Sequence, residues 1–277
     1  MAEPRKSSGK STAAAPGAPS RWRRVLLPLL LLAVAAGLLT AVFLLLRNAL
    51  FTGNPRLALR EVRVRTSGYW RNREKALCSR IGLTTGVNLF SVDLRTLRRR
   101  LEHIPCIASA EVRRVPPDTV EIRLEERIPR AVLGNPRSPF VVDEYCVIIP
   151  RTESMAGKEK LRLPVIVGIP LRGLKSGTVE PRLQNAVDLI MVILRGFPDI
   201  RVHQIMIGRT GSLELMLNYR EKFPTYHVIM PAKNPGNAFR LSALQSAIIA
   251  ARNRGDNRTE FDLSYEGQVV VREAVKK

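Results

Sequence analysis

An uninterrupted apolar run near the N-terminus constrains this chain more than any other feature of its sequence. Residues 25–46 read VLLPLLLLAVAAGLLTAVFLLL, 22 residues without a charged side chain, and fifteen of them are Leu, Val or Phe. As an α-helix the run would be about 33 Å long, enough to cross a hydrocarbon core of about 30 Å. Its large apolar residues together favour insertion by roughly 5 to 9 kcal/mol. We therefore predict a transmembrane helix over residues 25–46.

A cleaved signal peptide is the alternative interpretation of this run. A basic segment precedes it, and Ala33-Val34-Ala35 has the small-x-small pattern of a cleavage site. Cleavage there would leave the apolar segment GLLTAVFLLL as the new N-terminus, whereas the apolar regions of signal peptides end at about 15 residues. The length of the run favours an uncleaved anchor.

The segment before the anchor sets the expected orientation. Residues 1–24 are rich in small and polar residues, Pro and Gly, with little to bury, so we predict a disordered cytoplasmic tail. The tail ends in Arg21-Trp22-Arg23-Arg24, a pattern that suits the headgroup region and favours retention on the cytoplasmic side. We expect a single-pass type II protein of the inner membrane, with its C-terminal domains outside the cytoplasm, in the periplasm.

The strong basic charge admits two interpretations. The chain has 45 Lys and Arg against 24 Asp and Glu, a formal net charge of +21. Such a surface can meet anionic lipid, cell-wall polymer or nucleic acid, or it can be a set of solvated faces. The second interpretation is favoured because the charge is spread along the chain, with Arg98-Arg99-Arg100 as the tight run. Aromatic residues make up 5%, too few for base-stacking platforms, so a nucleic-acid partner is not expected.

Residues that could carry chemistry are scattered. Cys78, Cys106 and Cys146 form no CxxC motif, so we expect neither a zinc site nor a disulfide framework. Three free buried thiols are favoured over one bridge. His103, His203 and His227 have no nucleophile or carboxylate at a motif spacing, and no G-x-S-x-G, H-E-x-x-H or phosphate-cradling glycine loop occurs. We expect no catalytic residue, cofactor or metal, and therefore no enzyme.

Residues 57–126 have the pattern of a compact α/β unit. Alternation over 59–65 predicts a half-buried strand, and residues 71–81 predict a short helix with Asn72 as a possible cap. A second helix opens at Ser91 or Asp93 and stops at Pro105. It would bury Leu94, Leu97, Leu101 and Ile104. Two strands, 107–115 and 119–125, follow around a Pro-Pro-Asp turn, so the order strand–helix–helix–strand–strand predicts a small sandwich with both helices on one face of the sheet.

Residues 127–277 predict a second domain built on strands. Short strands are expected at 140–143 and 146–149, and longer ones at 200–207, 212–218 and 225–230. Pro181 opens a helix through Leu194, expected to bury Leu183, Val187, Ile190 and Leu194. A second amphipathic helix, 239–251, presents Leu241, Leu244 and Ile248 on one face. The chain closes with a hairpin of strands 259–265 and 268–272.

A family resemblance becomes specific in these segments. The pattern Pro105-x-Ile107-x-x-Ala110-x-Val112-x-Arg114-x-x-Pro117-x-Thr119-Val120-x-Ile122, followed by Glu126-Arg127-x-Pro129-x-Ala131, resembles the POTRA domain of the bacterial cell-division family FtsQ/DivIB. Further similar segments are Gly86-x-Asn88-Leu89-Phe90, Leu163-Pro164-Val165-Ile166-x-Gly168 and Asp262-Leu263-Ser264-Tyr265. Tyr145 and Met230-Pro231 depart from the family pattern at turns. The resemblance implies an α+β fold, with one transmembrane helix, a POTRA domain (β-α-α-β-β) and a C-terminal mixed-sheet β domain with helices.

The resemblance also implies a function. Members of this family are non-enzymatic scaffolds of the divisome, the protein assembly at the division septum. Their terminal hairpin accepts a strand from a coiled-coil FtsB/FtsL-like pair, which suits the unpaired edge that a terminal hairpin offers. The POTRA domain is implied to recruit other division proteins. The implied partner-binding residues are Asp262, Leu263, Ser264, Tyr265, Gln268, Val269, Val270 and Val271, and the implied recruitment surface contains Arg98, Arg99, Arg100, Val120 and Glu121.

Two other classes of protein remain open at this stage. A POTRA-bearing chaperone or export accessory would bind extended polypeptide at the same kind of sheet edge. A peptidoglycan hydrolase would need a catalytic constellation that the sequence does not present. A structural interpretation of the terminal hairpin also remains open. In it, the alternate valines of 269–271 belong to the core, and the remaining valine reflects strand propensity alone.

Overall fold

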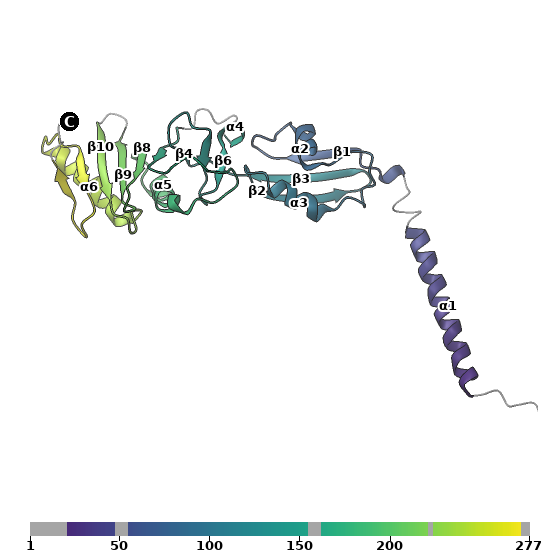
Figure 1. The fold of residues 1–277 in the computed structure, drawn as a ribbon. Helices are drawn as coiled ribbons and strands as arrows, with labels where there is room; N and C mark the ends of the chain where they lie inside the picture. Colours follow the sequence, from purple (N-terminus) through teal and green to yellow (C-terminus); the bar gives the residue numbers. More distant parts are fainter. Residues whose placement is uncertain (1–20, 48–54, 155–161, 221–223, 273–277) are drawn as a thin grey trace, which may run out of the picture. The chain divides into compact units, whose positions relative to one another are not determined.

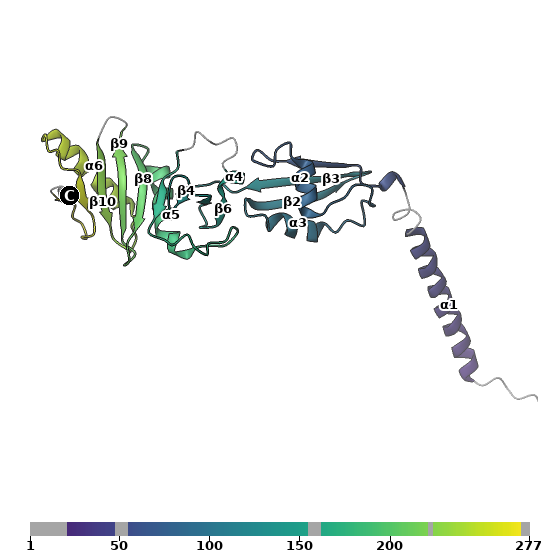
Figure 2. The ribbon, with the colours of Figure 1, turned by 45° about the horizontal axis from the view of Figure 1, so that its top comes forward.

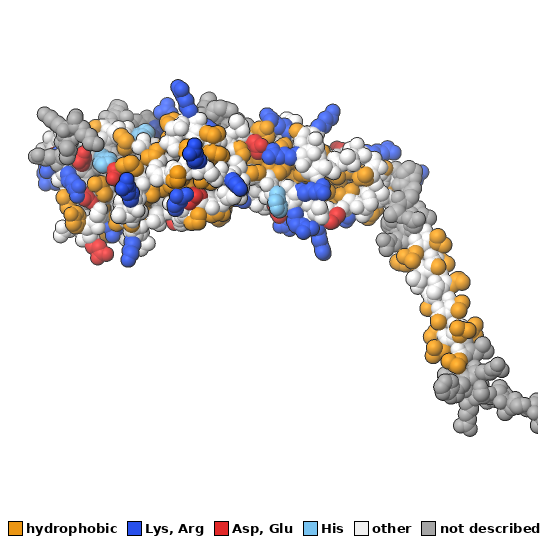
Figure 3. Space-filling view, in the orientation of Figure 1, with side chains coloured by type: hydrophobic (Ala, Val, Ile, Leu, Met, Phe, Trp, Pro, Cys, Tyr) orange, Lys and Arg blue, Asp and Glu red, His pale blue; other side chains and the backbone are white. Residues whose placement is uncertain are grey.

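The computed structural model describes residues 21–47, 55–154, 162–220 and 224–272. The chain divides into two units, residues 1–55 and 56–277. The first contains α1 (Arg21–Arg47), a helix of 27 residues that includes the predicted span and extends beyond it at both ends. The window Pro28–Leu45 has a mean hydropathy of 2.6, and none of it is buried, so its hydrophobic side chains lie at the surface (Figure 3). Within the described ranges, α1 is the one helix long and apolar enough to cross a membrane. Most of the predicted tail, residues 1–20, lies outside them.

The second unit begins with a POTRA-like sandwich, whose sheet has the order β1-β3-β2 (Figure 1). Strand β3 lies in the centre, parallel to β1 and antiparallel to β2. The predicted order strand–helix–helix–strand–strand is confirmed, and the Pro116-Pro117 peptide bond in the β2–β3 turn is cis. The elements are η2 (Pro55–Leu57), β1 (Glu61–Arg65), α2 (Glu74–Ile81), α3 (Leu94–Glu102), β2 (Ile107–Val115) and β3 (Thr119–Glu126).

Local chemistry explains where the two helices begin. The Asp93 carboxylate accepts hydrogen bonds from the backbone N–H groups of Arg95 (3.0 Å) and Thr96 (3.3 Å), which confirms the predicted cap of α3. The prediction for Asn72 is wrong: this residue has φ 57°, and α2 begins after Arg73 without a side-chain cap. An asparagine tolerates the left-handed conformation, so its position in a turn resembles a cap in the sequence.

Both helices pack on one face of the POTRA sheet. The inward positions of β3, Val120 and Ile122, are fully buried. From the helices, Leu77, Leu97 and Leu101 belong to the same apolar cluster. Alternation along β3 therefore directs Glu121 and Arg123 to the opposite face of the sheet.

The rest of the second unit is organised on a nine-stranded mixed sheet of order β12-β11-β10-β9-β8-β7-β4-β5-β6 (Figures 1 and 2). The pairs β4/β7, β7/β8 and β10/β11 are parallel, and the others are antiparallel. The predicted α+β fold class is confirmed. The strands are β4 (Ala131–Leu133), β5 (Phe140–Val142), β6 (Ile148–Pro150), β7 (Val165–Val167), β8 (Ile200–Ile207), β9 (Leu213–Tyr219), β10 (Thr225–Met230), β11 (Glu260–Asp262) and β12 (Val270–Arg272).

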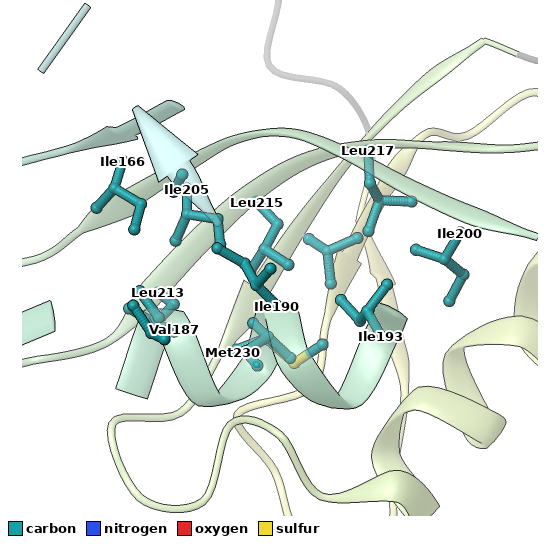
Figure 4. Close-up of a cluster of buried hydrophobic side chains, with 14 of the residues drawn as sticks. Ile166, Val187, Ile190, Ile193, Ile200, Ile205, Leu213, Leu215, Leu217 and Met230 are labelled. Carbon is teal, nitrogen blue, oxygen red and sulfur yellow. The ribbon is translucent and has the colours of Figure 1, made fainter. Parts of the chain in front are cut away.

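Helix α5 (Gln184–Gly196) follows η3 (Pro181–Leu183) and covers the middle of this sheet. In Figure 4 its side chains Val187, Ile190 and Ile193 meet isoleucine and leucine side chains of the strands. Burial of Leu183, Val187 and Ile190 confirms the prediction, but Leu194 is 60% exposed and was predicted wrongly. Successive residues of a helix are about 100° apart, so Ile193 takes the inward position and Leu194 turns out of the core.

Helix α6 (Ala238–Asn253) lies at the end of the sheet that carries β10 to β12 (Figure 2). Its predicted inward residues Leu241, Leu244 and Ile248 are buried. The Asn237 side chain caps it by accepting from the backbone N–H of Phe239 (2.9 Å). A short helix, α4 (Arg151–Ser154), follows β6.

Candidate functional site

The terminal hairpin, defined here as β11, β12 and residues 263–269 between them, ends the nine-stranded sheet. Within the described residues, β12 pairs with β11 alone, antiparallel over three residue pairs. Its other side faces no strand of the part of the chain that the structure describes. The predicted position of the hairpin at a sheet edge is therefore confirmed.

Alternation decides which side chains of β12 reach solvent, whereas residues 261–263 of the hairpin are all buried. Phe261 and Leu263 are each 1% exposed, and Val269 and Val271 pack against the domain core. Val270 is 36% exposed and Tyr265 54% exposed. A partner that pairs with β12 would therefore meet Val270 and Tyr265, while the flanking valines anchor the strand.

Two of the predicted partner-binding residues hold the hairpin together from inside. Asp262 is 3% exposed; its carboxylate accepts from the backbone N–H of Ser264 (2.9 Å) and forms an ion pair with Arg272 across the hairpin. Leu263 donates its N–H to Ile229 O (2.9 Å), and its carbonyl accepts from Arg240 of α6 (2.6 Å). Asp262 and Leu263 thus position the hairpin, whereas Ser264, Tyr265, Gln268 and Val270 are exposed.

The predicted recruitment residues lie in three different places. Arg98 and Arg99 are exposed on α3, where Arg98 pairs with Glu102 (2.8 Å). Arg100 donates to the carbonyl of Ile81 at the end of α2 (2.8 Å). Val120 is fully buried beneath the helices, and Glu121 belongs to the other face of the sheet. One contact surface cannot contain both Glu121 and α3.

The outer face of the POTRA sheet carries a charge network that motif reasoning did not single out. Glu121 is 2% exposed because the Arg65 and Arg113 side chains cover it from β1 and β2. The Arg113 guanidinium, through its hydrogen bond, holds the pKa of Glu121 below its ordinary value. Arg123 lies next along β3, 3.8 Å from Glu111. The available signal in the sequence was a set of charged residues two apart on each of the three strands: Glu61, Arg63 and Arg65 on β1, Glu111 and Arg113 on β2, and Glu121, Arg123 and Glu125 on β3.

The family-like motif residues have structural roles. Glu126 accepts from Thr66 Oγ1 (2.7 Å) and from the backbone N–H groups of Tyr69 (2.6 Å) and Trp70 (3.1 Å). Arg127 pairs with Asp143 (2.7 Å), which is 2% exposed. Arg114 donates to the carbonyls of residues 89 and 92. The motif therefore fixes loops around the POTRA sheet.

The cysteines are free thiols, as expected, although Cys78 is only half-buried. Burial raises the pKa of Cys106 and of Cys146 to about 12, so neither forms a thiolate readily. The residues described contain no group of three or more His, Cys, Asp or Glu arranged to hold a metal ion.

Comparison with known proteins bears on this architecture. Residues 57–127 match the family model described as the POTRA domain, FtsQ-type. The chain is 30% identical over 161 residues to the cell division protein FtsQ of Syntrophotalea carbinolica, covering 56% of this chain and 54% of that protein. It is 30% identical over 117 residues to FtsQ of Geobacter sp. (strain M21), covering 42% and 41% of the two chains. For FtsQ of Myxococcus fulvus the identity is 29% over 150 residues, covering 53% and 50%.

The fold and these matches define a class: an α+β protein in which an apolar N-terminal helix precedes an FtsQ-type POTRA domain and a mixed-sheet domain. The resemblance to the FtsQ/DivIB family of cell division proteins is thereby confirmed. The chain spans about half the length of the curated relatives it matches.

Proposed function

We propose that this protein is a non-enzymatic, single-pass scaffold of the bacterial divisome, anchored in the inner membrane by α1 with its folded domains in the periplasm. It links an FtsB/FtsL-like coiled-coil pair to septal peptidoglycan synthesis. Support comes from the FtsQ-type POTRA match, from relatives named as cell division proteins, and from the apolar helix. The observation that carries the partner-binding role is that, within the described part of the chain, β12 has a neighbouring strand on one side alone.

Strand addition at β12 is the proposed mode of binding. A strand with a neighbour on one side presents unpaired N–H and C=O groups, which an incoming segment satisfies with main-chain hydrogen bonds. Val270 and Tyr265 offer exposed apolar surface beside this edge. Val269 and Val271 keep the edge extended because their side chains are anchored in the core.

Val270→Pro tests this mode. Proline cannot donate a backbone hydrogen bond and resists the geometry of a sheet interior, so co-purification of the FtsB/FtsL-like pair is expected to be lost. Val270→Thr is the matched control, because threonine keeps the N–H and the branched side chain. Tyr265→Ala, which leaves the backbone intact, is expected to weaken capture. Unchanged capture in both Val270→Pro and Tyr265→Ala would contradict strand addition.

Recruitment to the division site is the second part of the proposal, and the exposed arginines of α3 are its proposed surface. The variant Arg98→Glu/Arg99→Glu reverses two charges on α3. Midcell fluorescence of a tagged protein should be lost in this variant and kept in Arg123→Glu, which alters the opposite face of the sheet. Loss of midcell fluorescence in Arg123→Glu, with retention in Arg98→Glu/Arg99→Glu, would instead assign recruitment to the outer face of the POTRA sheet. Even envelope staining of the parent protein would instead favour an export accessory.

A further inference from the structure

Strands β4, β5 and β6 form a meander at one end of the nine-stranded sheet, and this meander is buried on both of its faces. Successive side chains of a strand point to opposite faces, so each strand contributes to two sides. One face belongs to the apolar core under α5, to which the meander contributes Ala131, Leu133, Val142 and Ile148. The other face belongs to the apolar core of the POTRA domain, to which it contributes Val132, Val141 and Ile149. The POTRA domain and the mixed-sheet domain therefore share one element.

The three residues on the POTRA side lie next to one another across the meander. Val141 pairs with Val132 on β4 and with Ile149 on β6. Each of them is 4% exposed or less. Their cluster includes Trp70 and Cys106 of the POTRA domain, which are also buried. An apolar sheet face that the neighbouring domain removes from water stabilises the contact between the two domains.

Residues 127–130, which join β3 to β4, are held by hydrogen bonds to both domains. Arg127 donates its backbone N–H to the carbonyl of Cys106 in the POTRA domain (2.8 Å). Its guanidinium pairs with the buried Asp143 after β5 (2.7 Å). Arg130 donates its N–H to the carbonyl of Val142 (2.7 Å). A hinge needs residues that can change φ and ψ freely, and this connector has little of that freedom.

A polar contact at Glu153 closes the border between the domains. The Glu153 carboxylate, on α4 of the mixed-sheet domain, accepts from Arg80 of α2 (2.8 Å) and from the Cys106 thiol (3.3 Å). The indole N–H of Trp70 donates to the same sulfur (3.3 Å). The Glu153 side chain is 16% exposed, so water screens its ion pair with Arg80 less than it screens a pair at the surface.

Consecutive domains usually move relative to one another unless the interface between them is large and hydrophobic. We propose that the POTRA domain and the mixed-sheet domain form one rigid body, which keeps the exposed arginines of α3 and the edge of β12 at a fixed separation. The inference rests on the proposed function for the partners that bind these two surfaces. A partner at one surface then meets the other at a constant distance, whereas hinged domains offer a range of distances.

The test measures the distance between two spin labels by double electron–electron resonance, on the full chain in a neutral detergent. The labels are attached at Lys75→Cys on α2 and Ser246→Cys on α6, two exposed helical positions. The half-buried Cys78 is replaced by serine. Cys106 and Cys146 are at most 1% exposed, so the label does not reach them.

The variant Ile149→Ala/Glu153→Ala weakens the border by removing an apolar contact and the polar one. Ile148→Ala is the matched control, because Ile148 is the neighbouring residue of β6, is equally buried, and faces the other core. Far-ultraviolet circular dichroism checks that each variant is folded. Glu153→Ala alone, which leaves both apolar cores intact, is the second variant in case the double substitution unfolds the chain.

The parent and Ile148→Ala are expected to give one narrow distribution of distances. In Ile149→Ala/Glu153→Ala the distribution should be at least about twofold wider, and in Glu153→Ala its width should be intermediate. Addition of the FtsB/FtsL-like pair to the parent should leave the mean distance unchanged.

A broad or two-peaked distribution in the parent would overturn the proposal. Equal widths in the parent and all variants would overturn it too, since the contacts at the border would then not be what holds the domains together. A shift of the mean distance when the pair binds would show that the domains hinge. If the pair does not bind at all, the proposed function is contradicted and the rigid body stands, because the distance in the free chain needs no partner.

Discussion

The central strand of the POTRA sheet and the last strand of the terminal hairpin differ in how completely they are paired. Strand β3 of the POTRA sheet runs for eight residues between two neighbours, and its inward side chains are fully buried. Strand β12 has three residues and, within the described part of the chain, one neighbour, and its first side chain, Val270, reaches solvent. A strand that is paired on one side leaves backbone N–H and C=O groups available to a further strand. The hairpin therefore has the most to gain from another strand.

Amide hydrogen exchange should expose this contrast most strongly. The amides of β3 are expected to exchange about a thousandfold or more slowly than those of β12, because local opening costs little at a short edge strand and approaches the global free energy of unfolding in a central one. Mass spectrometry of peptides from the full chain measures both regions. Similar exchange rates in β3 and β12 would contradict the expected difference in local stability. Slower exchange in β12 after a partner is added would show that the partner stabilises this strand.

Truncation of one buried side chain in each region gives the next largest effect. Ile122→Ala should lower the free energy of unfolding of the POTRA domain by about 2 to 5 kcal/mol, because a cavity opens beneath both helices. Urea unfolding followed by tryptophan fluorescence reports on it, since Trp70 is buried in the same cluster. Val270→Ala is the counterpart and should cost less than about 1 kcal/mol. Equal losses would mean that the hairpin is as firmly packed as the sheet.

Glu126→Ala should have an intermediate effect. Three donors at Thr66, Tyr69 and Trp70 lose their acceptor, which is expected to cost about 1 to 3 kcal/mol in the same unfolding experiment. The neighbouring Glu125 accepts from the exposed Ser109 hydroxyl (2.9 Å), so Glu125→Ala is a matched control expected to cost less than about 0.5 kcal/mol. If the two variants were equally stable, the loop at 66–70 would not depend on Glu126.

The smallest expected effect is that of Arg98→Ala on stability. Its ion pair with Glu102 lies at the surface of α3, where water and salt screen it, so the urea midpoint should stay close to that of the parent protein. The loss should disappear at high salt and should match that of Glu102→Ala. A loss of stability as large as that of Glu126→Ala would show that α3 depends on this pair.

The sequence carried enough information for the long elements and for the edge position of the hairpin. Asp93 followed by leucines at helical spacing indicated α3, and strict alternation indicated β3. Strands β4 and β7, of three residues each, were not predicted, because so short a run shows no clear period of two; β5 and β6 are equally short and were predicted one residue longer than they are. Strands β4 and β7 are flanked by family-like motifs, which marked the segments without revealing their conformation.

The candidate surfaces were harder to predict than the elements. A motif identifies residues that matter without stating whether they contact a partner or hold the fold. Asp262 and Leu263 belong to the second kind, and Val120 is part of the core. Leu194 shows the opposite error, because apolar spacing placed it in the core while the register of α5 leaves it 60% exposed. These distinctions need side-chain direction and burial in three dimensions.

The order of strands in the large sheet has a consequence for synthesis. Strands β4 to β6 form a meander on one side, β7 returns beside β4, and each later strand joins the one made just before it. Because the chain is synthesised from its N-terminus, the sheet can grow outward one strand at a time. Strand β7 is the exception, since it returns past β5 and β6 to pair with β4. When each strand pairs with the strand made just before it, the entropy cost of closing the loop between them stays low. Strand β12 is made after β11 and is the outermost strand of the described sheet, so a second polypeptide can continue the same process at this edge.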